Sequence, residues 1–172
     1  MSAVRNALIV GGGIGGLSTA IGLGRIGVGA DVVEIQKQWA IYGIGIIQPG
    51  NAIRAYKALG VADRCLERGF VYKRQRHYDA DGNMIGERMM PAIDGLDIVG
   101  HCGIPRPVLH DILVSGARAA GADIRTGVTV AALRDLRDGV EAVFIGPITA
   151  ATMYHGGNQP AIWGICKRSI QA

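Results

Sequence analysis

Leu8-Ile9-Val10-Gly11-Gly12-Gly13-Ile14-Gly15-Gly16-Leu17 is the stretch that decides the fold of this chain of 172 residues. An apolar run over residues 6–10 predicts a buried strand, and the glycines after it predict a tight turn. Residues 14–27 have the apolar spacing of a helix, and residues 30–35 predict a second buried strand. The order of strand, glycine turn, helix and strand predicts a βαβ unit.

The glycines have the G-x-G-x-x-G spacing of a dinucleotide-binding turn. Gly11 allows the tight turn, Gly13 lets the backbone approach a pyrophosphate, and Gly16 lets the helix pack against the strand. The helix that begins at Ile14 and Gly15 offers unpaired N–H groups and the positive end of its dipole to phosphate oxygens.

Glu34 lies at the end of the second predicted strand, where the acidic residue of a dinucleotide-binding unit is expected. Its carboxylate can accept hydrogen bonds from ribose hydroxyls and would repel a 2′-phosphate, which disfavours NADP at this position. Strand, glycines, helix and acidic residue all fall in the required order, so the sequence predicts dinucleotide binding over a purely structural glycine turn.

The composition is that of a globular protein, with 49% hydrophobic and 19% charged residues and a net charge of +4. The basic run at residues 73–77 is interpreted as a solvated strand face, so no nucleic acid partner is expected. Three widely spaced cysteines predict reduced thiols and a cytoplasmic protein, without a metal site. The four histidines are expected to be surface or packing residues. No signal peptide or membrane partner is expected.

Further along, residues 36–48 predict a loop, residues 49–59 a helix capped by Gly60, and residues 61–68 a short helix. Residues 70–78 and 83–88 predict an antiparallel insertion around a turn at residues 79–82. A helix is predicted over residues 105–120, with Leu109, Ile112 and Leu113 as its apolar stripe. It is followed by strands at 122–125, 128–136 and 140–144, the last two joined by a turn at Asp138–Gly139. Residues 145–172 show no period and are expected to be poorly ordered or badly packed.

The expected fold is therefore α/β, a Rossmann-like βαβ domain with an antiparallel β insertion, incomplete at its C-terminus. Residues 1–144 form the partial nucleotide-binding domain in this prediction, and residues 145–172 form an atypical tail.

Three separate stretches resemble the N-terminal half of the single-component FAD-dependent aromatic-ring monooxygenases, such as p-hydroxybenzoate, salicylate and 3-hydroxybenzoate hydroxylases. The first is the glycine turn with Glu34. The second is residues 42–55, Tyr-Gly-Ile-Gly-Ile-Ile-Gln-Pro-Gly-Asn-Ala-Ile-Arg-Ala, and the third is residues 104–113, Ile-Pro-Arg-Pro-Val-Leu-His-Asp-Ile-Leu. The resemblance covers about residues 4–144.

This resemblance implies FAD as cofactor, NAD(P)H as transient electron donor, and hydroxylation of a small aromatic substrate through a flavin hydroperoxide. It implies that Glu34 binds the adenosine ribose and that Arg106 reaches the pyrophosphate and ribityl region. It also implies that backbone around Val130 lies by the adenine and that the loop containing Gly45 approaches the flavin ring. A cation at a helix start opposes the helix dipole, which favours an anionic partner for Arg106 over a surface salt bridge.

The chain departs from the family after Phe144, where the later Asp-Gly and Gly-Asp motifs and most of the substrate-binding sheet are missing. A frameshift and a genuine short protein with an unrelated tail both explain this. Three functions stay open: an impaired FAD-dependent hydroxylase, a non-catalytic module that binds FAD, NAD or ADP, and an inert fragment. No catalytic residue, substrate or oligomeric state follows from the sequence.

Overall fold

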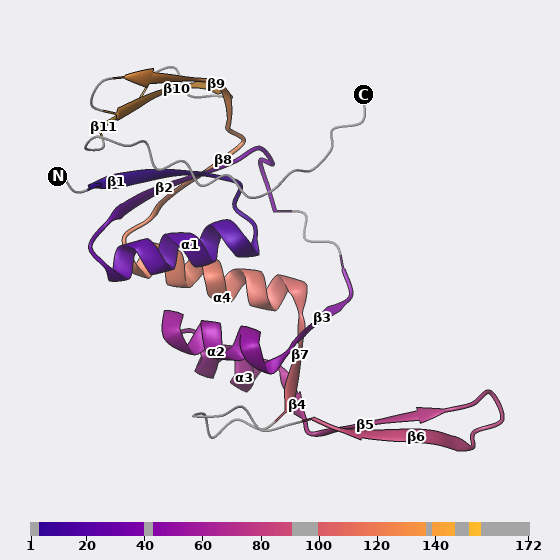
Figure 1. Ribbon diagram of the computed structural model, residues 1–172. Helices are drawn as coiled ribbons and strands as arrows, with labels where there is room; N and C mark the ends of the chain where they lie inside the picture. The colour runs from indigo at the N-terminus through magenta and orange to yellow at the C-terminus, as the bar shows by residue number, and fades with distance from the viewer. Residues whose placement is uncertain (1–3, 40–42, 91–99, 137–138, 147–151, 156–172) are drawn as a thin grey trace. The chain divides into compact units, whose positions relative to one another are not determined.

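The structure, a computed structural model, describes residues 4–39, 43–90, 100–136, 139–146 and 152–155. The chain divides into two compact units, one made of residues 1–40 and 113–172 and the other of residues 41–112 (Figure 1). The mixed α/β class predicted from the sequence is confirmed. Within the described ranges, no helix combines the length and apolar character needed to cross a membrane.

The first unit contains the predicted βαβ arrangement. Strands β1 (Asn6–Val10), β2 (Gly29–Glu34) and β8 (Asp123–Thr126) form a parallel sheet in the order β1-β2-β8. Helix α1 (Ile14–Arg25) connects β1 to β2. The helix ends two residues before its predicted end, because the chain turns at Gly27, which has a φ of 78°.

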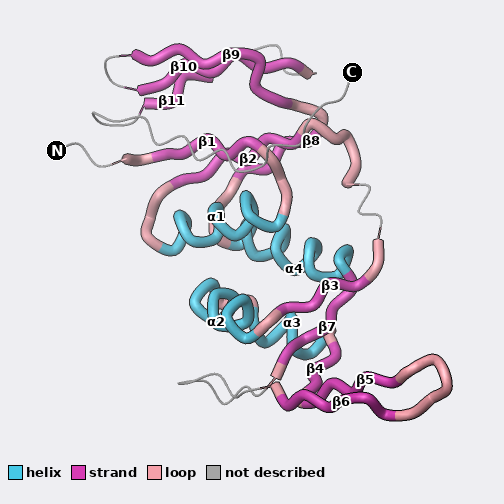
Figure 2. The backbone as a smooth tube through the Cα atoms, turned by 45° about the vertical axis from the view of Figure 1, so that its right-hand side comes forward, coloured by secondary structure: helices cyan, strands magenta, loops and turns pink. Residues whose placement is uncertain are grey.

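Side chains alternate between the two faces of this parallel sheet. One face packs against strands β9 (Thr129–Leu136) and β10 (Gly139–Ile145), and the fully or nearly buried residues of that layer are Leu8, Val33, Val128 and Ala142. The other face is covered by α1, whose Leu17 and Ile21 are buried. Figures 1 and 2 show this order of layers, with α1 and the C-terminal end of α4 (Arg106–Ala119) together on one side of the sheet.

Strand β11 (Thr152–His155) lies in the segment for which no strand was predicted. It pairs antiparallel with β10, in a sheet of order β11-β10-β9. Four residues are too short a stretch for strand alternation to stand out in a sequence, so the pairing with β10 decides the conformation. Residues 156–172, and Asp138 of the predicted turn, lie outside the described residues.

The second unit contains the predicted antiparallel insertion. Strands β3 (Gly45–Gln48), β7 (His101–Pro105) and β4 (Phe70–Tyr72) form one sheet, in the order β3-β7-β4. Helices α2 (Gly50–Leu59) and α3 (Ala62–Arg68) follow β3, and strands β5 (Arg74–Tyr78) and β6 (Met84–Met89) form a separate hairpin. The prediction of a loop throughout residues 36–48 is wrong for β3, which is held by its pairing with β7.

Helix α4 confirms the predicted apolar stripe, because Leu109, Ile112 and Leu113 are fully buried. His110, which was expected to be a surface or a packing residue, is a packing residue, since only 5% of it is exposed. Position 110 lies next to the stripe, and the packing around this part of the helix extends past the three apolar residues.

Gly16 provides a test of the contact between α1 and the glycine turn. A methyl group built at Gly16 would overlap the carbonyl oxygen of Gly11, whereas one at Gly15 would meet no atom within 4 Å. We expect Gly16→Ala to lower the free energy of unfolding by about 1–3 kcal/mol, because backbone must move to admit the methyl group. Gly15→Ala is the matched control and should leave stability unchanged or slightly higher. Equal urea midpoints for the two variants would contradict this packing.

Alkaline pH provides a test of the core of the second unit. Burial raises the pKa of the Cys65 thiol from 9.0 to about 11, and the neighbouring Cys102 adds to the shift. The folded chain therefore keeps a proton that the unfolded chain releases, so this stabilisation is complete below pH 9 and is lost as the pH rises toward 11. We expect a loss of about 1–2 kcal/mol over this interval in urea unfolding. Cys65→Ala should flatten the pH profile, and parallel profiles for variant and wild type would refute the assignment.

Candidate dinucleotide-binding site

The glycine turn connects the end of β1 to the start of α1. Gly11 has a φ of 109°, a conformation that favours glycine, and its amide donates a hydrogen bond to the carbonyl oxygen of Val33 at 2.7 Å. This bond ties the turn to β2. Gly11 therefore has the role of a tight-turn residue that its place in the motif predicts.

Gly13 is the N-cap of α1, with an extended backbone and an exposed surface. No side chain caps the helix at this residue, and the first turn contains no acidic residue. The first amides of a helix have no partner within the helix, so those of Ile14, Gly15 and Gly16 remain available to an outside acceptor. The absence of acidic side chains in the first turn leaves the positive end of the helix dipole free to attract an anion.

The glycines at the start of α1 differ in how much free space surrounds them. Methyl groups built at Gly13 and Gly15 would meet no atom within 4 Å, whereas Gly16 lies against the backbone of Gly11. Gly16 is therefore required by packing inside the protein. Gly13 and Gly15 have no such internal reason to be glycine, and the open space beside them fits a ligand that approaches the backbone closely.

Glu34 is the last residue of β2 and is partly exposed. Its Oε2 accepts a hydrogen bond from the amide of Gly12 at 2.9 Å, and its Oε1 accepts one from the amide of Gln36 at 2.9 Å. Each carboxylate oxygen can accept more than one hydrogen bond, so both keep capacity for ribose hydroxyls. The carboxylate is thus held in place by backbone on two sides, a role that its position in the motif does not reveal.

Trp39 also lies beside the turn. A methyl group built at Gly12 would come within 3.1 Å of the indole Nε1 and 3.3 Å of the Glu34 Cβ, so Gly12 is enclosed by these two side chains. Trp39 was not predicted as a site residue, since an aromatic residue in an irregular segment after a strand has no motif to identify it. Its indole provides a fluorescent group next to the candidate site.

Val130 belongs to β9 and packs its side chain against the buried layer between the sheets, while its backbone pairs with Phe144. The chain enters β9 beside the end of β2, because Gly127 and Val128 donate backbone hydrogen bonds to the carbonyl oxygens of Gln36 and Glu34 at 3.0 and 2.9 Å. The structure thus brings the start of the strand that carries Val130 to the segment that carries Glu34.

Gly45 and Arg106 come together within the second unit. Gly45 begins β3 and pairs with Pro105, the residue before Arg106 at the start of α4. The Arg106 Cδ would lie 3.6 Å from a methyl group built at Gly43, which places its side chain beside the loop that precedes β3. None of the ion pairs between described residues includes Arg106, and both Arg106 and Gly45 are exposed. Tyr42, whose role the sequence left open, lies outside the described residues.

A family model described as an FAD binding domain matches residues 5–152. The chain belongs to this family. It is 36% identical over 140 residues to the YetM protein of Bacillus subtilis (strain 168), covering 81% of this chain and 38% of that protein. It is 32% identical over 146 residues to 3-hydroxybenzoate 6-hydroxylase of Klebsiella oxytoca, covering 81% of this chain and 36% of the hydroxylase. The chain therefore spans well under half the length of these curated relatives.

Solved structures give the same fold. p-Nitrophenol 4-monooxygenase PnpA from Pseudomonas putida DLL-E4 superposes with a TM-score of 0.77 at 19% identity, over 93% of this chain and 40% of that one. Aklavinone-11 hydroxylase, solved with FAD and aklavinone, superposes with a TM-score of 0.70 at 24% identity, over 93% of this chain and 32% of that one. The predicted resemblance to part of the FAD-dependent monooxygenases is confirmed, and the family match continues past Phe144.

Glu34 provides a test of how the turn is held. Removing its carboxylate in Glu34→Ala leaves the amides of Gly12 and Gln36 without these acceptors, so we expect the free energy of unfolding to fall by about 1–3 kcal/mol. Glu34→Gln keeps one carbonyl oxygen and should fall between alanine and wild type. Glu67→Ala, at an exposed position of α3, is the control. A Glu34→Ala variant as stable as the control in urea unfolding would show that these hydrogen bonds do not hold the turn.

Proposed function

We propose that this chain binds FAD through the glycine turn and Glu34, and that it forms the FAD-binding part of an NAD(P)H-dependent aromatic hydroxylase. The observation that carries the proposal is the open helix start, where Gly13 and Gly15 leave free space in front of available amides. The FAD binding domain match over residues 5–152 supports FAD in place of another dinucleotide.

Different residues would bind different parts of FAD. The amides of Ile14, Gly15 and Gly16 would hold pyrophosphate oxygens, and Glu34 would accept hydrogen bonds from the adenosine ribose. Val130 would offer backbone to the adenine. These assignments rest on the motif, on the resemblance and on the geometry of the first unit.

Gly45 and Arg106 are proposed for the flavin end of the cofactor. A guanidinium has several donors in a planar arrangement that suits phosphate oxygens, which supports Arg106 near the pyrophosphate and ribityl chain. Bound FAD would supply the redox chemistry, accepting electrons from NAD(P)H and passing them to oxygen. The protein would position the reacting groups and limit access of water. The substrate class, a small aromatic molecule, is supported by the substrate in the name of 3-hydroxybenzoate 6-hydroxylase.

The extent of the FAD-binding part is also a proposal. We propose residues 1–144 for it and residues 145–172 as a tail of different character. Within residues 145–172, β11 adds a strand to this part through its antiparallel pairing with β10.

FAD binding can be followed by the fluorescence of Trp39. The chain has two tryptophans, so Trp163→Phe leaves the indole beside Gly12 as the single emitter. We expect added FAD to quench this emission with saturation. Gly13→Ala should weaken binding at least about tenfold, because its methyl group would occupy the space of the pyrophosphate. The same variant should unfold at the wild-type urea concentration, since no protein atom lies within 4 Å of that methyl group.

Gly86→Ala, at another open glycine in the second unit, is the matched control and should bind FAD like wild type. An unchanged FAD affinity in Gly13→Ala would refute the phosphate-binding assignment. Titration with ADP and NAD separates a general dinucleotide module from an FAD site. Oxidation of NADH by the FAD-loaded chain, with and without 3-hydroxybenzoate, then tests the hydroxylase part of the proposal.

A further inference from the structure

The segment that follows β2, residues 35–39, is exposed except at Trp39. Residues 35–38 are all exposed, whereas Trp39 is partly buried and its indole Nε1 is shielded from solvent. The indole reaches back to the glycine turn, where a methyl group built at Gly12 would lie 3.1 Å from Nε1 and 3.2 Å from Cζ2. Trp39 therefore anchors this segment against the turn that precedes α1.

Gly12 is a glycine for a reason that lies outside the motif. It occupies a variable position of the G-x-G-x-x-G spacing, and its φ lies outside the left-handed region. Neither phosphate binding nor backbone conformation therefore requires glycine here. The room for a side chain is instead taken by the indole of Trp39 and by the Glu34 Cβ, which would lie 3.3 Å from the added methyl group.

This enclosed side of the turn carries a hydrogen bond that orients Glu34. The amide of Gly12 donates to the Glu34 Oε2 at 2.9 Å, and the indole lies against the α-carbon of the same glycine. Gly12 itself is buried. A large ring at this place keeps water from competing for the amide, which strengthens the hydrogen bond. It also hinders the Gly12 peptide from turning away from the carboxylate.

We propose that Trp39 is a positioning residue for the ribose of the cofactor, and that it acts through Gly12 and Glu34. The inference rests on the proposed function, in which Glu34 accepts hydrogen bonds from the adenosine ribose. With the indole in place, the carboxylate has one orientation before the ligand arrives, so less conformational freedom is lost on binding. Without the indole, the Gly12 peptide can move, and the amide of Gln36 alone holds the carboxylate firmly, through its other oxygen.

A purely structural role for Trp39 has different consequences. If the indole only anchors residues 35–38, its loss lowers stability and weakens the binding of every adenine nucleotide to the same extent. A positioning role instead weakens the binding of those nucleotides that carry ribose hydroxyls. The two roles are separated by the ratio of two dissociation constants, one for ADP and one for 2′,3′-dideoxy-ADP, which lacks both hydroxyls.

The test is isothermal titration calorimetry of the full chain with these two nucleotides. Wild type should bind ADP at least about tenfold more tightly, because the dideoxy nucleotide has no hydroxyl to donate to the carboxylate. Trp39→Leu, whose side chain is too short to cover Gly12, should reduce this preference to about twofold or less. Trp39→Phe keeps an aromatic ring and should retain most of it. Tyr56→Leu, which removes a buried ring from α2, is the matched control and should keep the wild-type ratio.

Urea unfolding without ligand tests the contact itself. Gly12→Ala should lower the unfolding midpoint of wild type, because its methyl group meets the indole and the Glu34 Cβ. In the Trp39→Leu background the same substitution should have a much smaller effect, since the indole is gone. Equal effects in both backgrounds would overturn the proposal. If Trp39→Leu does not fold by circular dichroism, Gly12→Ala replaces it in the titrations, since its methyl group displaces the indole.

The titrations also distinguish this inference from the proposed function. A preference for ADP that is lost in Glu34→Ala but unchanged in Trp39→Leu would overturn the positioning role and leave the ribose site in place. Wild type that binds both nucleotides equally, or neither, would refute the ribose site and the positioning role with it.

Discussion

The close approach of α1 to the glycine turn is the constraint on which the first unit depends. Gly16 lies so near the carbonyl oxygen of Gly11 that no other side chain fits there without movement of the backbone. This contact fixes where α1 begins, and it therefore fixes where the helix presents its free amides. The same approach lets Leu17 and Ile21 reach the sheet and become buried. Packing and the capacity to bind an anion thus have one geometric origin.

The sequence predicted the parts of the fold whose signals are local. The βαβ unit, the apolar stripe of α4 and the left-handed Gly60 that ends α2 all follow from periodicity or from a single residue type. Strands β3 and β11 did not, because each has four residues and is held by a partner strand elsewhere in the chain. The sequence left open whether His110 lies at the surface or in the packing, since burial at the margin of a helix stripe depends on neighbours that a helical period does not identify.

The residues of the candidate site were likewise predicted only in part. Motif spacing identified Gly11, Gly13, Gly16 and Glu34, and the structure supplies a distinct local environment for each. Spacing could not show that the Glu34 carboxylate holds the amide of Gly12, because the bond joins residues 22 apart in the chain. It could not identify Trp39 either. Both depend on how the chain returns to the turn after β2, which no short motif encodes.

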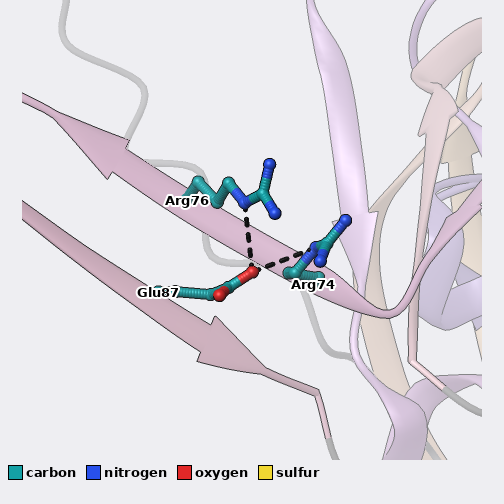
Figure 3. A network of polar contacts seen from close by, with 3 residues as sticks. All are labelled: Arg74, Arg76 and Glu87. Carbon is teal, nitrogen blue, oxygen red and sulfur yellow. Dashed lines mark hydrogen bonds and ion pairs between the residues drawn. The ribbon is translucent and has the colours of Figure 1, made fainter. Parts of the chain in front are cut away.

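The basic run at residues 73–77 shows that the pairing of strands, and not the order of residues along the chain, decides which side chains are neighbours. From the sequence alone, these basic side chains are interpreted as the solvated face of a strand. In the hairpin, alternate residues separate onto two sides, and β6 adds Glu87 and Met89 beside Arg76 and Arg74. The bulge after His77 then sets Met84 opposite Tyr78. Tyr78, Met84 and Met89 therefore share one side of the hairpin with Arg74, Arg76 and Glu87. On that side the Oε1 of Glu87 lies 3.0 Å from the Nε of Arg74 and 3.1 Å from the Nε of Arg76 (Figure 3). These contacts depend on the pairing of the two strands and do not follow from the basic run alone.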